Sequence, residues 1–187
     1  MCSHVRIAVV VCCLVSALSF SAVCADAVKK VDTAEKVDDL LGALKKTGAK
    51  VILLNVWSTQ CTPCLAEMPT LVRTALKFKN NLDVAFLGLC LSSEGDSKKV
   101  ALEAASEVMR LKKVTYQNLL WTGKGEALLD RFNIIGTPYT VFVSGEGKVL
   151  GDILELPEDP VKAAEEIEKG IAKALSSPAK TDASATK

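Results

Sequence analysis

The sequence contains a single histidine, His4, and only one Cys-x-x-Cys pair, at Cys61 and Cys64. A structural zinc site needs four thiolate or imidazole ligands, usually from two such pairs, and downstream of this pair only Cys90 remains. A haem attachment site needs a histidine directly after the second cysteine, where this chain has Leu65. The sequence therefore argues against zinc and haem, and we expect no metal and no cofactor.

An excess of positive charge is also missing. The 187 residues include 23 Lys and Arg against 22 Asp and Glu, and the only charged residue among the first 25 is Arg6. Loss of that segment would leave a formal net charge of zero, so nothing indicates nucleic-acid binding. The loop Gly123-Lys-Gly125 lacks the Gly-Lys-Ser/Thr order of a phosphate loop, which argues against a nucleotide ligand.

The N-terminal segment, residues 1–25, has the pattern of an export signal. One positive charge precedes an almost unbroken apolar run from Ile7 to Val23, and small residues follow. The run is short for a membrane span of about 20 residues, which favours a cleaved signal, while an uncleaved anchor stays open. A third interpretation is a bacterial lipoprotein signal, in which Cys24 carries lipid, although Val23 is bulkier than usual before such a cysteine. All three predict an exported, periplasmic protein, and the last two tether it to the membrane through its N-terminus.

The stretch Cys61-Thr-Pro-Cys64 follows the hydrophobic run Val51–Trp57 and stands at the expected start of a helix. Helix-terminal amides stabilise a thiolate, and a spacing of three residues lets the second thiol close a small disulfide. The alternative, two cysteines buried as small apolar side chains, fits poorly with an exposed strand-to-helix turn. The pattern therefore favours redox chemistry on sulfur.

Strands and helices alternate along the rest of the chain, which is long enough for one buried domain over residues 28–175. This alternation predicts an α/β sandwich of three layers, with helices flanking a mixed central sheet. Residues 176–187 are small and polar and are expected to form a disordered tail. The apolar patterns predict strands at 28–31, 51–57, 82–91, 117–121, 139–143 and 148–154, and helices at 33–46 with Thr33 as N-cap, 62–79 bent by Pro69, 97–113, 126–132 and 160–175.

Three separated motifs then carry a family resemblance. They are Asn55-Val-Trp57-Ser-Thr-Gln-Cys61-Thr-Pro-Cys64, Glu67-Met-Pro69, and Gly136-Thr137-Pro138-Tyr-Thr140-Val-Phe142. In this order they resemble a thioredoxin-like domain, most closely the exported TlpA/ResA/CcmG group of thiol-disulfide oxidoreductases. The resemblance covers residues 28–175. It implies the thioredoxin-like fold, with a strand and a helix added between about Leu82 and Trp121.

The resemblance also implies roles for the two cysteines and their neighbours. Cys61 would be the nucleophile, and Cys64 would resolve the mixed disulfide, closing a Cys61–Cys64 disulfide. Pro63 separates them without a backbone donor, and Trp57 would pack beneath the site. Cys90, inside an apolar strand, is interpreted as a buried inert thiol, and Trp121 as a core residue.

The Thr137–Pro138 bond is expected to be cis, and it would leave the backbone of Thr137 free to pair with an extended substrate.

Glu67 lies on the same helix face as Cys64, and a carboxyl group of raised pKa there could exchange protons with the inner thiol. The alternative is an ordinary solvated glutamate. Thioredoxin has a buried aspartate where Asn55 stands, and asparagine cannot titrate, which favours Glu67 as the acid. Gln60 replaces the tryptophan common before the first cysteine, so the partner surface is expected to differ.

The resulting prediction is an extracytoplasmic enzyme that reduces protein disulfides, with protein dithiols or disulfides as substrates and a membrane electron donor. The Thr62-Pro63 dipeptide lacks the histidine of strongly oxidising sites, which favours a reductant. The resemblance suggests cytochrome c maturation as one setting. Two alternatives stay open. One is a thiol peroxidase, which would need a Pro-x-x-x-Thr-x-x-Cys context, although Ser58 stands in place of the threonine and the proline is absent. The other is a non-catalytic binding or chaperone lipoprotein.

Overall fold

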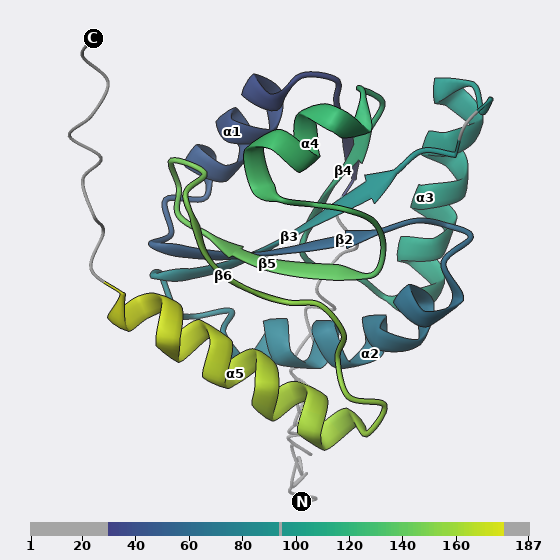
Figure 1. Cartoon of the computed structure of the whole chain (residues 1–187). Coiled ribbons are helices and arrows are strands. Elements are labelled where there is room, and N and C mark those ends of the chain that lie inside the picture. Colours follow the sequence, from purple (N-terminus) through teal and green to yellow (C-terminus); the bar gives the residue numbers. More distant parts are fainter. Residues whose placement is uncertain (1–29, 94, 178–187) are drawn as a thin grey trace, which may run out of the picture.

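The computed structural model describes residues 30–93 and 95–177. Within these ranges, no helix combines the length and apolarity that a membrane crossing requires. The expected signal or anchor at 1–25, with Cys24, lies outside the described residues, as does the expected tail from residue 178. The elements follow one another (Figure 1) as β1 (Val31–Ala34), α1 (Val37–Lys46), β2 (Val51–Trp57), α2 (Thr62–Lys77), β3 (Val84–Leu91), α3 (Lys98–Lys112), β4 (Gln117–Trp121), α4 (Gly125–Phe132), β5 (Tyr139–Val143), β6 (Val149–Ile153) and α5 (Pro160–Ser176).

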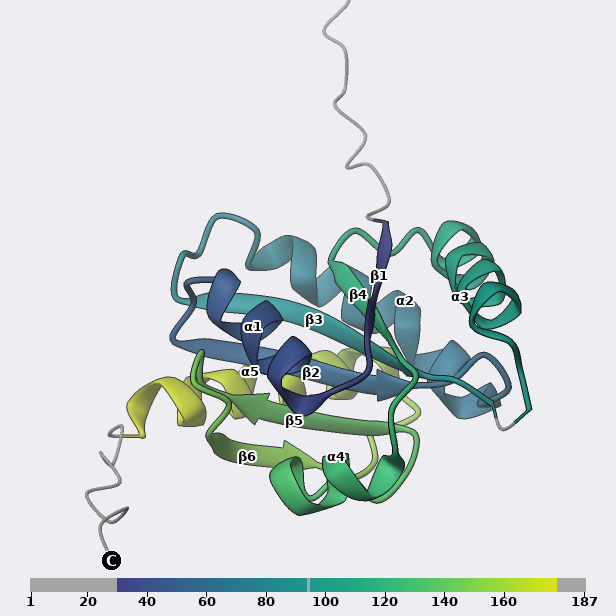
Figure 2. The same ribbon diagram turned by 90° about the horizontal axis from the view of Figure 1, so that it is seen from above.

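The six strands form one mixed sheet in the order β1-β4-β3-β2-β5-β6. The strands β1, β4, β3 and β2 run parallel to one another, whereas β5 pairs antiparallel with both β2 and β6. Figure 2 shows this sheet from above, with β2 and β3 in its middle. The helix α3 and the strand β4 form the unit expected between residues 82 and 121, and β4 lies between β3 and β1.

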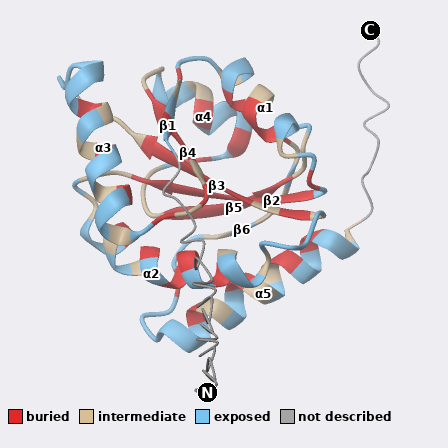
Figure 3. Ribbon diagram, turned by 180° about the vertical axis from the view of Figure 1, so that it is seen from behind, coloured by how far each residue is buried: buried red, intermediate tan, exposed pale blue. Residues whose placement is uncertain are grey.

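Helices cover both faces of the sheet. The helices α2, α3 and α5 bury side chains in one core cluster, whereas α1 and α4 bury theirs in the other. The residues of β2 alternate between the two clusters, and every one of them is buried. Figure 3 shows the buried strands between the outer helices. The predicted three-layer α/β sandwich is therefore confirmed.

The first predicted helix starts later than expected. Thr33 belongs to β1, which pairs with β4 and buries Val31 and Ala34, so it does not cap a helix. The helix α1 starts at Val37, where the carboxylate of Asp39 accepts the backbone N–H groups of Glu35 and Lys36. Pairing with the sheet and burial thus outweighed a local capping signal.

At the other end of the domain, Ser176 belongs to α5 and not to the tail.

Candidate active site

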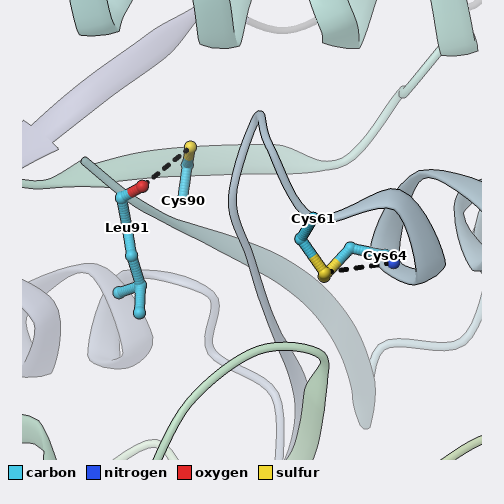
Figure 4. Close-up of a disulfide and its surroundings, with 4 residues drawn as sticks. All are labelled: Cys61, Cys64, Cys90 and Leu91. Atoms are coloured by element: carbon cyan, nitrogen blue, oxygen red, sulfur yellow. Dashed lines mark hydrogen bonds between the residues drawn. A yellow bond between two sulfur atoms is a disulfide. The ribbon is translucent and has the colours of Figure 1, made fainter. Parts of the chain in front are cut away.

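Cys61 and Cys64 form a disulfide at the start of α2 (Figure 4). Their Cα atoms are 5.3 Å apart. Cys61 is the N-cap residue, and its Sγ accepts the backbone N–H of Cys64 at 3.2 Å. Pro63 lies in the first turn, where its missing N–H costs no helical hydrogen bond. The local sequence therefore places both sulfur atoms at a helix N-terminus.

The two cysteines differ in access to solvent. Cys64 is 1% exposed, whereas Cys61 is only partly buried and packs against the edge of the core. In the reduced state, unpaired N–H groups and the helix dipole would stabilise a thiolate at the Cys61 position. A disulfide of another protein can therefore reach Cys61 more easily than Cys64. This access is what the expected role of Cys61 as the nucleophile requires.

A groove of about 470 Å³ lies beside the disulfide. The start of α2, the loop before β5 and the segment between β6 and α5 form its walls. It brings together three residues that the sequence analysis singled out, Pro63, Glu67 and Pro138. The Thr137–Pro138 peptide bond is cis, as predicted. Thr137 is partly buried directly before that proline.

Glu67 is half-buried on α2 and lines the groove. The pKa of this carboxyl group is raised to about 7: burial has the largest effect, the backbone N–H of Leu156 partly opposes it, and the negative charge of Glu155 adds a smaller rise. A carboxyl group with a pKa near neutrality can accept and donate protons at physiological pH. Glu67 is therefore not an ordinary solvated glutamate.

Trp57 is buried on the same face of the sheet as Cys64. Its indole Nε1 donates a hydrogen bond to Oδ1 of Asn118, at 2.9 Å, and Asn118 in turn donates to the carbonyl oxygen of Tyr116. Asn118 lies on β4, within the added unit. Sequence reasoning missed this residue, because a buried asparagine in an apolar strand carries no local signal for its partner.

A polar row crosses the sheet on this face. Asn55 of β2 lies opposite Thr140 of β5, and on its other side Gly88 of β3 separates it from Asn118. Asn55 is 1% exposed, and its amide group has no hydrogen-bond partner within the described part of the chain. An unpartnered buried amide is costly, so stability alone does not explain an asparagine here.

Cys90, the remaining cysteine among the described residues, lies on β3 opposite Trp57. It is 1% exposed, and its Sγ lies 3.8 Å from the carbonyl oxygen of Leu91 (Figure 4). Burial raises the pKa of this thiol to about 12, although a hydrogen bond from the backbone of Thr59 lowers it slightly. The thiol is therefore buried and protonated at neutral pH, in agreement with the sequence interpretation. Trp121 is likewise buried in the core, at 3% exposure.

The segment between β6 and α5 was also missed as part of the site. Leu154, Glu155, Leu156 and Glu158 line the groove although they lie about 90 residues from the cysteines. Their sequence has no motif that distinguishes this segment from an ordinary loop. Only the antiparallel β5–β6 pairing and the packing of α5 against α2 carry this loop to the disulfide.

Comparison with known proteins gives the fold an independent reference. No protein-family profile matches the chain, and no curated protein sequence matches it. Among solved structures, the thiol:disulfide interchange protein DsbE from Chlorobium tepidum aligns with a TM-score of 0.53 and 22% identity, over 80% of this chain and 99% of that one. The thioredoxin domain of a thiol-disulfide oxidoreductase from Bacteroides vulgatus aligns with a TM-score of 0.51 and 21% identity, over 67% and 82%.

These likenesses show that the chain has the thioredoxin fold. The chain is therefore a thioredoxin-fold protein with a Cys61–Cys64 disulfide at the start of α2. The two similar structures are named as a thiol-disulfide oxidoreductase and a thiol:disulfide interchange protein, and their likeness confirms the thioredoxin-like fold expected from the sequence.

Proposed function

We propose that this protein is an extracytoplasmic thiol-disulfide oxidoreductase that reduces disulfides in other proteins. The observation that carries the proposal is the asymmetry of the Cys61–Cys64 pair: one sulfur is accessible at a helix N-terminus and its partner is buried one turn later. The groove beside the pair, lined by Pro63 and Pro138, offers a surface for the substrate chain.

The reaction cycle starts from the dithiol. The Cys61 thiolate attacks one sulfur of the client disulfide, forms a mixed disulfide and releases the other client sulfur as a thiolate, which takes up a proton. The Cys64 thiolate then attacks Sγ of Cys61, so that the Cys61–Cys64 disulfide forms and the second client thiol leaves. Two electrons and two protons pass to the client. A dithiol of a membrane electron donor reduces the pair again by the same exchange.

Glu67 is proposed to exchange the proton of Cys64. The inner thiol is buried and must lose its proton before it can attack the mixed disulfide. Glu67 lies three residues further along α2 and therefore on the same helix face, with a pKa of about 7. Asn55, at the place of the thioredoxin aspartate, cannot perform this step.

The cellular setting is part of the proposal. Residues 1–25 support export, with a cleaved signal, an uncleaved anchor or a lipid on Cys24 as the three forms of the N-terminus. The similar structure from Chlorobium tepidum carries the name DsbE. The resemblance suggests the cysteines of apocytochrome c as one client class. Incorporation of labelled palmitate into the wild type but not into Cys24→Ala would identify the lipidated form.

The test combines a redox titration with an activity assay. We expect the Cys61/Cys64 couple to have a reduction potential nearer that of thioredoxin, about −270 mV, than that of DsbA, about −120 mV. The protein should reduce insulin disulfides in the presence of dithiothreitol. Cys61→Ser should abolish this activity, and Cys90→Ala should retain it as the matched cysteine control. A potential near −120 mV would contradict the reducing role, and activity in Cys61→Ser would contradict the mechanism.

Client proteins can be trapped in the cells that produce this protein. Cys64→Ala leaves the nucleophile in place but removes the resolving thiol, so mixed disulfides with clients should accumulate. Their identification by mass spectrometry after non-reducing separation would name the clients. The double variant Cys61→Ser/Cys64→Ala should trap none.

A further inference from the structure

The charged residues that line the groove beside the disulfide are all acidic. Three glutamates line it, Glu67 from α2 and Glu155 and Glu158 from the segment between β6 and α5, and no basic residue is among the described lining residues. Arg73, further along α2, donates a hydrogen bond to Oγ1 of the lining residue Thr70 at 3.0 Å. The described lining of the groove therefore carries acidic side chains and no basic one.

The remaining walls are largely apolar. Prolines and aliphatic side chains surround the glutamates, and Leu154 is 64% exposed at the edge of the groove. In the loop leading to the cis proline, Ile135 is 74% exposed. A volume of about 470 Å³ lies within the range of ligand-binding clefts, which is about 300 to 1,000 Å³. The space fits one or two side chains of a client segment.

We propose that this groove selects client proteins that carry a lysine or arginine, flanked by apolar residues, next to the cysteine that Cys61 attacks. The inference rests on the proposed reductase function and adds a substrate class to it. Complementary charge would hold the client segment along α2, and the apolar walls would contact the aliphatic stem of its basic side chain.

Two physical effects favour a cationic occupant. The carboxyl groups of Glu67 and Glu155 line the same groove and repel each other when both are ionised, which adds to the larger effect of burial on the pKa of Glu67, and a positive charge between them would relieve that repulsion. Oppositely charged clients also approach faster, because electrostatic complementarity acts mainly on the association rate. An acidic client segment would meet the same groove with repulsion.

The experiment compares three disulfide-bonded test peptides that differ only in the residue next to one cysteine: lysine, glutamine or glutamate. The measured quantity is kcat/KM for their reduction by the wild type at low and at high salt. We expect the lysine peptide to exceed the glutamate peptide by about 5-fold to 10-fold at low salt, and the difference to shrink at high salt. In Glu155→Gln/Glu158→Gln this ratio should fall towards one, and in Glu155→Lys/Glu158→Lys it should invert.

The matched control is Glu103→Gln/Glu126→Gln, which removes the same charge from exposed positions on α3 and α4. It should keep the wild-type ratio. An equal rate for the lysine and glutamate peptides, or an unchanged ratio in Glu155→Gln/Glu158→Gln, would overturn the charge selectivity. The glutamine peptide separates the two proposals: its reduction by the wild type and not by Cys61→Ser tests the reductase function alone.

Discussion

Asn118 accepts a hydrogen bond from the indole nitrogen of Trp57 across 61 residues of sequence, at 2.9 Å. The bond links β2, which leads into the active-site turn, to β4 of the added unit. Gly88 of β3, which lies between them, provides the space, because a Cβ atom at this position would overlap the side-chain amide of Asn118. The added unit thus supports Trp57, the last residue of the strand that leads into the active-site turn.

Gly88→Ala should therefore destabilise the protein. We expect the free energy of unfolding to fall by about 1 to 3 kcal/mol, because the side chain of Asn118 must move and Trp57 loses its acceptor. Urea unfolding and the near-ultraviolet circular dichroism of the tryptophans would measure both effects. Gly42→Ala is the control, since nothing lies within 4 Å of a Cβ atom there and α1 favours alanine. Equal stability of Gly88→Ala and the wild type would refute this explanation of the glycine.

The unpartnered amide of Asn55 leads to the opposite expectation. Asn55→Leu preserves the approximate shape and removes a buried polar group without a partner, so the free energy of unfolding should rise by about 1 kcal/mol. Asn118→Leu makes the same exchange on the same face of the sheet, but it breaks the bond to Trp57 and should destabilise the protein. Denaturant titrations of both variants would show the contrast. A loss of stability in Asn55→Leu would mean that the amide has a structural partner.

Glu67 gives the stability of the oxidised protein a pH dependence. Its pKa is raised from 4.5 to about 7, so folding favours the protonated carboxyl group. The cost is absent below about pH 4.5, where the group is protonated in both the folded and the unfolded state. It grows between about pH 4.5 and pH 7, where only the folded state keeps the proton, and it is constant above that range. Glu67→Gln should match the wild type near pH 4 and be more stable at pH 8 by roughly 1 kcal/mol, because a half-exposed carboxylate keeps much of its hydration.

Thermal unfolding from pH 4 to pH 8 would test this prediction, with Glu126→Gln as a control at an exposed position of α4. The proton-exchange role has a separate readout. In Glu67→Gln, the rate at which Cys64 resolves a mixed disulfide should fall and should lose its dependence on pH near 7. An unchanged thiol titration and an unchanged reduction rate would exclude that role.

The three cysteines among the described residues should react in a fixed order after mild reduction. Cys61 is the accessible thiol at a helix N-terminus, whereas Cys64 and Cys90 are each 1% exposed, and the pKa of Cys90 is about 12. We expect iodoacetamide to modify Cys61 roughly 100-fold faster than either of the others at pH 7. Quantitative mass spectrometry of the labelled peptides would give the rates. Similar rates for all three would contradict the assignment of the nucleophile.

The local sequence determined the chemistry and the class of fold. The spacing of Cys61 and Cys64, the preceding apolar strand and the proline in the first helical turn are short-range signals, because helix starts and buried strands depend on neighbours within a few residues. The cis bond before Pro138 followed from its motif. Most element boundaries also agree, and Thr33 fails because pairing with a strand about 85 residues away competes with its capping preference.

Only the tertiary structure decided what surrounds the disulfide. Asn118 reaches Trp57, and Glu155 and Glu158 line one groove with Glu67, because strand order and helix packing bring distant segments together. A buried asparagine or a loop glutamate has no periodic or spacing signal that names its partner. The raised pKa of Glu67 likewise depends on burial and on a charge about 90 residues away. The sequence therefore indicated the reacting atoms, while three-dimensional packing set their environment, since desolvation and electrostatic interactions act through space and not along the chain.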